Sequence, residues 1–244
     1  KRLLDVSLLQ KKGLKISKIS RLDEVQIKKE VEEFYALSLN APGAYEAQIH
    51  ELIKAMVELN EPMFEKTFSN SVLKRGLETT MLKVVFPFLV RVGVMWKIGE
   101  IHPGQEHFVS NLIKQKLYSA IDGVVLPQGK KPLCILYLIE NELHELSLLF
   151  AAYLLKSLGK DVLYLGQSIP FVSLKAIVQD RQPDALYTVF TSHKPPSEFQ
   201  LHLDRISEFI GDANLFIYAS PELVNELECA DNIRFVKSFE EFLD

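Results

Sequence analysis

Five apolar runs of strand length alternate with helical stretches over the second half of the sequence. The runs occupy 133–139, 162–166, 185–190, 214–219 and 233–236, and the helical stretches occupy 142–158, 170–180, 196–210, 221–227 and 238–243. Continuous apolar strands that alternate with helices are typical of a parallel sheet covered on both faces. We therefore expect residues 132–244 to form a five-stranded, doubly wound α/β domain. Such domains bind ligands at the carboxyl ends of their strands.

The first half of the sequence is helical in pattern. Amphipathic stretches separated by short breaks cover 44–59, 61–75, 77–98 and 104–122. Consecutive helices with short connections favour a bundle, so we expect residues 43–126 to form a four-helix bundle. Pro87 lies inside the third of these helices and should kink or divide it.

Residues 1–42 precede this bundle. The pattern predicts two short helices over 1–22, the first ended by Gly13, and a connecting helix over 23–42 with Asp23 as its N-cap. The basic side chains of 1–22 could contact a phosphate backbone or form a solvated face. Because the sequence starts at Lys1 within helical periodicity, we expect a further segment upstream of it.

The composition argues against several classes of protein. The net charge is -4 over 244 residues, so no broad basic field for nucleic acid covers the chain. Residues such as Lys83 and Pro87 interrupt the most apolar stretches before they reach about 18 residues, and we expect no membrane span. Cys134 and Cys229 lack metal-site or redox spacing and should be core thiols of a cytoplasmic protein.

A charged cluster, ENELHELS at 140–147, directly follows the first predicted strand. If the next helix begins near Glu142, His144 stands in its first turn, where the positive end of the helix favours a neutral imidazole. A neutral imidazole can bind a metal, and Glu142 could accept a hydrogen bond from its other nitrogen. The alternative is an ordinary capping or surface histidine. Since no other cluster has metal-site spacing, His144 suits a metal whose remaining ligands come from a macrocycle.

The pattern Glu142-x-His144-x-x-Ser147 resembles the Asp-x-His-x-x-Gly motif of cobalamin-binding domains, which have a flavodoxin-like α/β fold. Two later landmarks of that family lie in register, because its Ser-x-Leu aligns with 188–190 and its Gly-Gly with 218–219. The resemblance implies that His144 ligates cobalt from below and that Glu142 orients the imidazole. It also implies that the cofactor contacts Ser147, Thr188, Tyr218 and Ala219.

Three glycines of the family pattern are replaced by larger residues in this sequence. Ser147 replaces a glycine, and Tyr218 and Ala219 replace the two glycines that leave room for the nucleotide tail of cobalamin. The tyrosine side chain could fill that space, since extra atoms in a tight space cost about 1–3 kcal/mol or force a rearrangement. The resemblance thus implies cobalamin as the cofactor, while these side chains oppose it.

A second resemblance lies in the helical half, where Trp96 is followed after nine residues by Glu106 and His107. This spacing resembles the four-helix cap of cobalamin-dependent photoreceptor repressors. The resemblance implies that the three side chains lie over the upper face of the cofactor. In those photoreceptors a histidine directly after the tryptophan captures cobalt after photolysis. That residue is Lys97 here, so a light response through this position is not expected.

The first 22 residues resemble the third and fourth helices of a MerR-type DNA-binding domain. Together the three segments resemble a MerR-family transcriptional regulator with a C-terminal cobalamin-binding-like module. The resemblance implies a non-enzymatic, cytoplasmic homodimer or homotetramer. It would bind operator DNA through a winged helix-turn-helix upstream of Lys1 and couple a corrinoid to oligomerisation and operator binding.

Two other functions stay open. A sensor that has lost cobalamin binding would serve dimerisation or bind another ligand, with Tyr218 in the former tail slot. A corrinoid protein of a methyltransferase system would also place a helical cap before an α/β domain, although residues 1–22 favour the regulator. His193 follows the third strand and could line the same cleft. The operator, the direction of regulation and the oligomeric state stay open as well.

Overall fold

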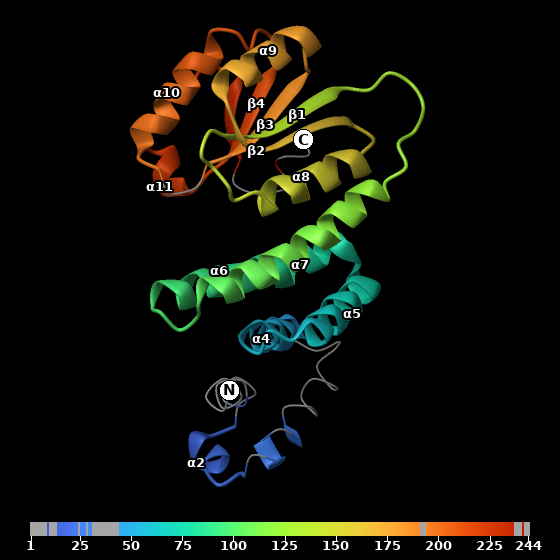
Figure 1. Ribbon diagram of the computed structural model, residues 1–244, viewed down its shortest axis with the longest axis vertical. Coiled ribbons are helices and arrows are strands. Elements are labelled where there is room, and N and C mark those ends of the chain that lie inside the picture. Colours follow the sequence, from blue (N-terminus) through green and yellow to red (C-terminus); the bar gives the residue numbers. More distant parts are fainter. Residues whose placement is uncertain are drawn as a thin grey trace. The chain divides into compact units, whose positions relative to one another are not determined.

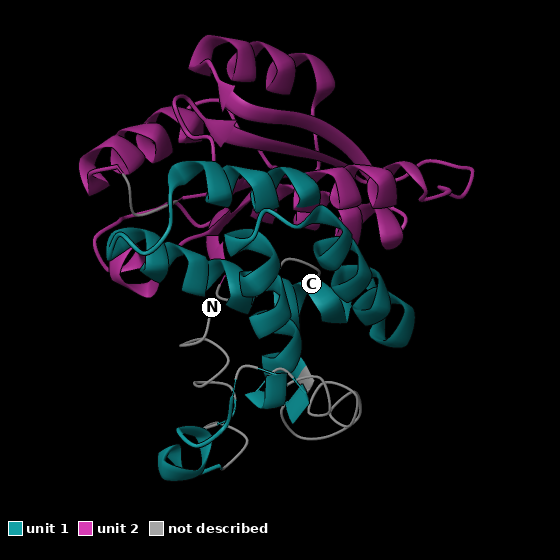
Figure 2. Ribbon diagram, turned by 60° about the horizontal axis from the view of Figure 1, so that its bottom comes forward, with its two compact units in different colours: residues 1–112 teal, residues 113–244 magenta. Residues whose placement is uncertain are grey.

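The computed structural model describes residues 9, 14–23, 25–27, 29–30, 44–190, 194–236 and 241. The chain divides into two compact units, residues 1–112 and 113–244, which Figure 2 colours separately. The boundary falls within one helix, α7 (Pro103–Asp122). Most of the helices predicted over 1–12, 23–42 and 238–243 lie outside the described residues.

In the described part of residues 1–30, α2 (Ile16–Ile19) is a short helix, and residues 9, 25–27 and 29–30 are helical as well. Three buried side chains, Leu9, Ile19 and Ile27, form a small apolar cluster there. The Asp23 carboxylate accepts a hydrogen bond from the backbone N–H of Gln26 at 2.7 Å, and the Gln26 side chain accepts one from the N–H of Asp23 at 3.0 Å. This reciprocal pair is a capping box, which agrees with the prediction that Asp23 is an N-cap.

The rest of the first unit is the predicted helical bundle. Its helices are α4 (Ala44–Val57), α5 (Glu61–Thr80), the π-helical turn η1 (Met81–Val85), α6 (Phe86–Lys97) and the start of α7. Gly76 leaves the helical conformation (φ 79°, ψ 164°), where the sequence predicts a break after 75. Pro87 stands in the first turn of α6 directly after η1. The wider π turn accommodates a ring that would otherwise clash with the carbonyl of Lys83, so the predicted division is confirmed.

One stretch of the described chain, Glu61–Lys97, is long and apolar enough to cross a membrane by length and composition alone. The core helices of a helical bundle can have the same composition. The large apolar side chains Phe64, Phe68 and Phe88 of this stretch are buried. The stretch is also broken at Gly76 and at η1, which suits packing within a bundle.

The second unit contains the predicted parallel sheet. Its strands are β1 (Leu133–Ile139), β2 (Asp161–Ile169), β3 (Ala185–Val189), β4 (Asn214–Tyr218) and β5 (Ile233–Val236), in the order β2-β1-β3-β4-β5. All described neighbours pair in parallel. The connecting helices are α8 (Leu146–Ser157), α9 (Phe171–Arg181), α10 (Pro196–Ser207) and α11 (Pro221–Val224). The predicted doubly wound fold is confirmed.

The two faces of this sheet carry different helices. Figure 1 shows α8 on one face and α9 and α10 on the other. On β1, Ile135, Tyr137 and Ile139 belong to the core cluster that packs against α9 and α10. Since side chains alternate along a strand, the intervening Leu136 and Leu138 point to the α8 face. The same alternation decides on which face each candidate site residue lies.

Candidate functional site

The loop between β1 and α8 carries the predicted histidine at the carboxyl edge of the sheet. The helix was predicted to begin near Glu142, which is wrong, because α8 begins at Leu146. The Glu142 carboxylate accepts hydrogen bonds from the backbone N–H groups of Leu143 and His144, at 2.9 and 3.0 Å. Such side-chain bonds to nearby backbone compete with helix formation. His144 therefore lies in the loop that leads into the helix and not in its first turn.

His144 and Glu142 form a close pair. The ring nitrogen Nδ1 of His144 lies 2.6 Å from the Oε1 atom of Glu142. The Glu142 side chain is 3% exposed, whereas that of His144 is 59% exposed. An acceptor at Nδ1 holds the proton on that atom, so the lone pair of the neutral ring belongs to Nε2. The pair thus sets Nε2 as the nitrogen that would coordinate a metal.

The end of β2 holds the backbone of this loop. The Gln167 side chain donates to the carbonyl of Leu143 at 2.8 Å. The Ser168 hydroxyl accepts from the N–H of Asn141 at 3.0 Å, and the N–H of Ser168 donates to the Glu142 carbonyl at 3.1 Å. Sequence reasoning assigned no role to these two polar residues. The signal for them was Gly166 at the end of the strand predicted over 162–166, since a glycine in a strand often marks a bulge.

That glycine, Gly166, adopts φ 84° and Ser168 adopts φ 50°. The register between β1 and β2 shifts twice along this stretch, between Leu136 and Tyr137 and between Tyr137 and Ile139. These irregularities let the last residues of β2 turn toward the loop. A side chain at 166 would be strained whatever the space around it.

The last residue of the loop, Glu145, is a second buried carboxylate. Its Oε1 atom lies 2.9 Å from Nζ of Lys114, and its Oε2 atom accepts a hydrogen bond from the Tyr164 hydroxyl at 3.0 Å. The Tyr118 hydroxyl lies at 3.5 Å from the same oxygen, which makes a weak contact. Burial, followed by the nearby charge of Glu145, raises the pKa of both Tyr118 and Tyr164. This network joins α7, β2 and the histidine loop, and no pattern in the sequence predicted it.

The residues predicted to contact the nucleotide tail of the cofactor lie on two different faces of the sheet. Ser147 lies half-buried in the first turn of α8. Tyr218 ends β4 on the α8 face, also half-buried, and pairs in register with Val189. Ala219 belongs to the core cluster on the α9 and α10 face. Thr188 points to that face too, because Leu186 and Phe190 on either side of it belong to the same cluster.

Thr188 is fully buried, and its hydroxyl has no hydrogen-bond partner among the described residues. Because it points to the α9 and α10 face, Thr188 does not lie with Ser147 and Tyr218. The neighbouring Val189 points to the α8 face instead. His193 lies outside the described residues.

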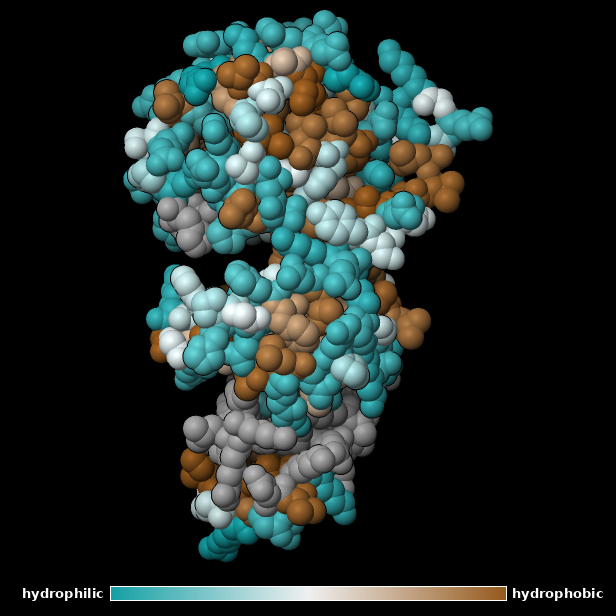
Figure 3. Space-filling model, viewed as in Figure 1, coloured by the Kyte–Doolittle hydropathy of each residue, from teal (hydrophilic) through white to brown (hydrophobic). Residues whose placement is uncertain are grey.

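The predicted upper-face residues flank one turn of the first unit. Trp96, in the last turn of α6, is 51% exposed. In the first turns of α7, Nδ1 of His107 lies 2.8 Å from Glu106, whose other oxygen accepts from the Ser110 hydroxyl. Val90, Val94 and Ile98 are exposed beside Trp96 in the sequence, and Figure 3 shows apolar side chains on the surface of both units.

The donor set decides which kind of metal could bind. Within the described part of the chain, no three His, Cys, Asp or Glu side chains converge on one point. Cys134 is buried, and burial raises the pKa of its thiol to about 11. Cys229 was predicted to be a core thiol, which is wrong, because it is exposed. A bare metal ion therefore does not fit these residues, whereas a metal that carries its own macrocycle needs only the axial His144.

Comparisons with known proteins find similarity in the helical region, in part of the sequence and in the fold. Residues 48–120 match the family described as "B12 binding domain", and they cover most of the bundle. The HTH-type transcriptional repressor CarH from Myxococcus xanthus is 31% identical over 126 residues, which are 52% of this chain and 42% of that protein. The chain thus matches less than half the length of this curated relative.

One solved structure shares the fold over most of its length. The monomethylamine corrinoid protein of Methanosarcina barkeri superposes with a TM-score of 0.62 at 14% identity, over 82% of this chain and 97% of that one. At this identity the likeness shows the fold alone. The resemblance found in the sequence is confirmed in this form: a B12-binding type of helical region, a repressor relative and the fold of a corrinoid protein.

Proposed function

We propose that this chain is the sensory module of a DNA-binding transcriptional regulator and that it binds cobalamin. The observation that carries the proposal is the 2.6 Å contact between His144 Nδ1 and the buried carboxylate of Glu142, at the carboxyl edge of the sheet. A histidine held in this way is prepared to be an axial ligand. The repressor relative supports the regulatory part of the proposal.

The residues of the loop and of the end of β2 would each have a role in binding the cofactor. Cobalamin would supply a cobalt centre, and His144 would hold it through Nε2. Glu142 would keep the proton on Nδ1, and Gln167 and Ser168 would keep the loop in place. Trp96, Glu106 and His107 are the proposed contacts of the upper face of the cofactor.

The regulatory part of the proposal has no catalytic step. Binding energy that differs between two oligomeric states would shift the population between them and so change the affinity for operator DNA. We propose a cytoplasmic homodimer or homotetramer with its DNA-binding element outside residues 1–244. We propose that this DNA-binding element is a domain of the MerR type.

A visible absorption titration with hydroxocobalamin tests cofactor binding. The wild type should bind with a spectral shift, and His144→Ala should lose that shift. His102→Ala is the matched control, because His102 is an exposed histidine in the other unit. Operator binding by the full-length protein, measured at one fixed salt concentration with and without cobalamin, tests regulation. If the full-length protein bound its own promoter no better than random DNA, the regulatory part of the proposal would be wrong.

A second candidate function is favoured by Tyr218. Its side chain ends β4 beside Val189 on the α8 face, where the family pattern has glycine. If it fills the tail slot, the module no longer binds cobalamin and serves dimerisation or another ligand. Tyr218→Gly separates the two functions: binding gained only in this variant favours the second, and binding by the wild type favours the first.

A further inference from the structure

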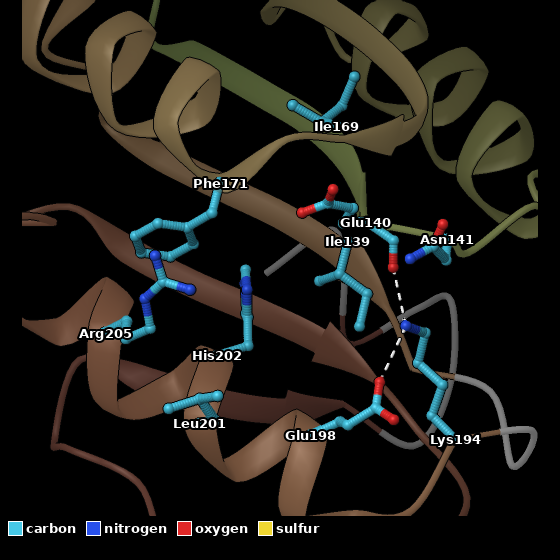
Figure 4. Close-up of a pocket in the computed structure, with 10 residues that line it drawn as sticks. All are labelled: Ile139, Glu140, Asn141, Ile169, Phe171, Lys194, Glu198, Leu201, His202 and Arg205. Atoms are coloured by element: carbon cyan, nitrogen blue, oxygen red, sulfur yellow. Dashed lines mark hydrogen bonds and ion pairs between the residues drawn. The ribbon is translucent and has the colours of Figure 1, made fainter.

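A cavity of about 220 Å³ opens at the carboxyl end of β1, on the α9 and α10 face of the sheet (Figure 4). Its apolar lining comes from Ile139, Ile169, Phe171 and Leu201. It is smaller than the roughly 300–1,000 Å³ of pockets for drug-sized ligands, so it suits a small molecule. All its residues belong to the second unit. The functions proposed above do not use it.

Arg205 is a cation at this cavity, and no acidic side chain of the described residues forms an ion pair with it. Its guanidinium carbon lies 3.7 Å from the centre of the Phe171 ring, and Figure 4 shows the group beside that ring. Among the described residues, Arg205 has no ion pair and no hydrogen bond through its side chain. Stacking on the ring orients the planar group and leaves its N–H fork for a planar, bidentate acceptor. A carboxylate has that geometry.

His202 lies in the middle of the labelled side chains in Figure 4 and offers a second polar group. Its Nε2 lies 2.9 Å from the hydroxyl of Tyr137, which is fully buried. The hydroxyl has no other partner among the described residues, so it must donate to Nε2 to avoid a buried, unused proton. The neutral ring then carries its own proton on Nδ1. Nδ1 is therefore a donor, and the structure gives it no partner within the described chain.

The remaining charges of the cavity are largely committed to one another. Lys194 donates to the backbone carbonyl of Glu140 at 2.8 Å and to the carboxylate of Glu198 at 3.2 Å. The side chain of Glu140 is exposed, so water screens its charge. Arg205 is exposed as well, and among the described residues it is the charge of this cavity that has no ion-pair partner for a ligand to displace.

We propose that this cavity binds a small carboxylate with an apolar body. The carboxylate pairs with the guanidinium of Arg205, and the body lies against Ile139, Ile169 and Leu201. His202 contributes a hydrogen-bond donor beside the charge. This is a second ligand site of the α/β unit, and it does not depend on whether a corrinoid binds at His144.

Benzoate is a suitable probe, because it joins a carboxylate to an apolar ring. An NMR titration of the isotope-labelled chain at pH 7 should show saturable shifts at residues around the cavity. Benzamide, which has the same shape without the charge, should bind at least about tenfold more weakly, as should Arg205→Gln, because each removes a charge-assisted bond. Glu140→Gln should tighten binding slightly. His144→Ala should bind benzoate like the wild type.

Arg181→Gln is the matched control, since Arg181 is an exposed arginine of α9 that does not line the cavity. It should leave benzoate binding unchanged. Equal binding of benzoate and benzamide by the wild type would overturn the proposal without the use of any variant. Wild-type affinity in a folded Arg205→Gln variant would overturn it as well. Inorganic phosphate that binds as tightly as benzoate would show that the apolar body is irrelevant and would also overturn it.

Discussion

The hydroxyl of Tyr137 on β1 lies 2.9 Å from Nε2 of His202 on α10, inside the core of the α/β unit. The histidine also meets the edges or faces of Phe171 and Phe190 at near right angles, 89° and 82°. Burial, followed by the nearby charges of Arg205 and Lys194, lowers the pKa of His202 from 6.5 to about 4. A neutral histidine is thus part of the folded core.

This histidine predicts a loss of stability in acid. Between pH 6.5 and about 4 the unfolded chain binds a proton at this position that the folded chain does not bind. The stability of the α/β unit should fall as the pH drops through that window, by up to about 3 kcal/mol from this group. His202→Gln should flatten this part of the profile. Amide hydrogen exchange of β1 and β3 measures stability as a function of pH. If the stability of the variant fell with pH as steeply as that of the wild type, His202 would not be the cause of the acid effect.

Replacement of Glu145 by glutamine should destabilise the α/β unit. The variant leaves the ammonium group of Lys114, which is 26% exposed, without its carboxylate partner. We expect a cost of about 1–3 kcal/mol. Glu140→Gln, at an exposed position of the same loop, is the control and should cost almost nothing. Urea unfolding followed by NMR signals of β1 distinguishes them, and equal stability of the two variants would argue against the network.

The bulged end of β2 predicts an effect of Gly166→Ala. At φ 84° a side chain is strained, and its Cβ would meet Tyr164 at 3.5 Å. We expect a loss of about 1–2 kcal/mol and weaker protection of the Asn141 amide, whose acceptor is the Ser168 hydroxyl. Gly104→Ala, in open space within α7, should be neutral or stabilising. Hydrogen exchange of Asn141 is the measurement, and unchanged protection in Gly166→Ala would contradict this role of β2.

Thr188→Val should stabilise the protein, because the threonine hydroxyl is buried without a partner among the described residues. Removal of a buried polar atom that has no hydrogen-bond partner should raise the free energy of unfolding by about 1 kcal/mol. Since Thr188 points away from the α8 face, the variant should also keep the wild-type affinity for cobalamin. Absorption titration measures this affinity. A large loss of cobalamin affinity in Thr188→Val would show that Thr188 does contact the cofactor.

The order and type of the elements were predictable because each leaves a periodic pattern. The strands were placed to within one residue except β2, whose bulges at Gly166 and Ser168 extend it to Ile169. The start of α8 was not predictable, since the Glu142 side chain binds backbone groups that a helix would otherwise organise. Tertiary partners such as Gln167 leave no local signal.

The same contrast holds for the site. The pairing of Glu142 with His144 followed from a spacing of two residues and is present in the structure. The face on which Thr188 lies was not recognised, because an alignment of motifs carries no information about which side of the sheet a residue faces. The exposure of Cys229 could not be read from its neighbours either, since burial depends on elements distant in the sequence.

The central claim is that His144 is the axial ligand of a bound corrinoid. Electron paramagnetic resonance of the cob(II)alamin form, prepared with unlabelled and with ¹⁵N-histidine-labelled protein, tests it most directly. If Nε2 of His144 ligates cobalt, the nitrogen splitting changes from a triplet to a doublet on labelling, and His144→Ala loses the doublet. A triplet that persists in the labelled protein would show that cobalt keeps a ligand from the cofactor itself, and this would contradict the claim.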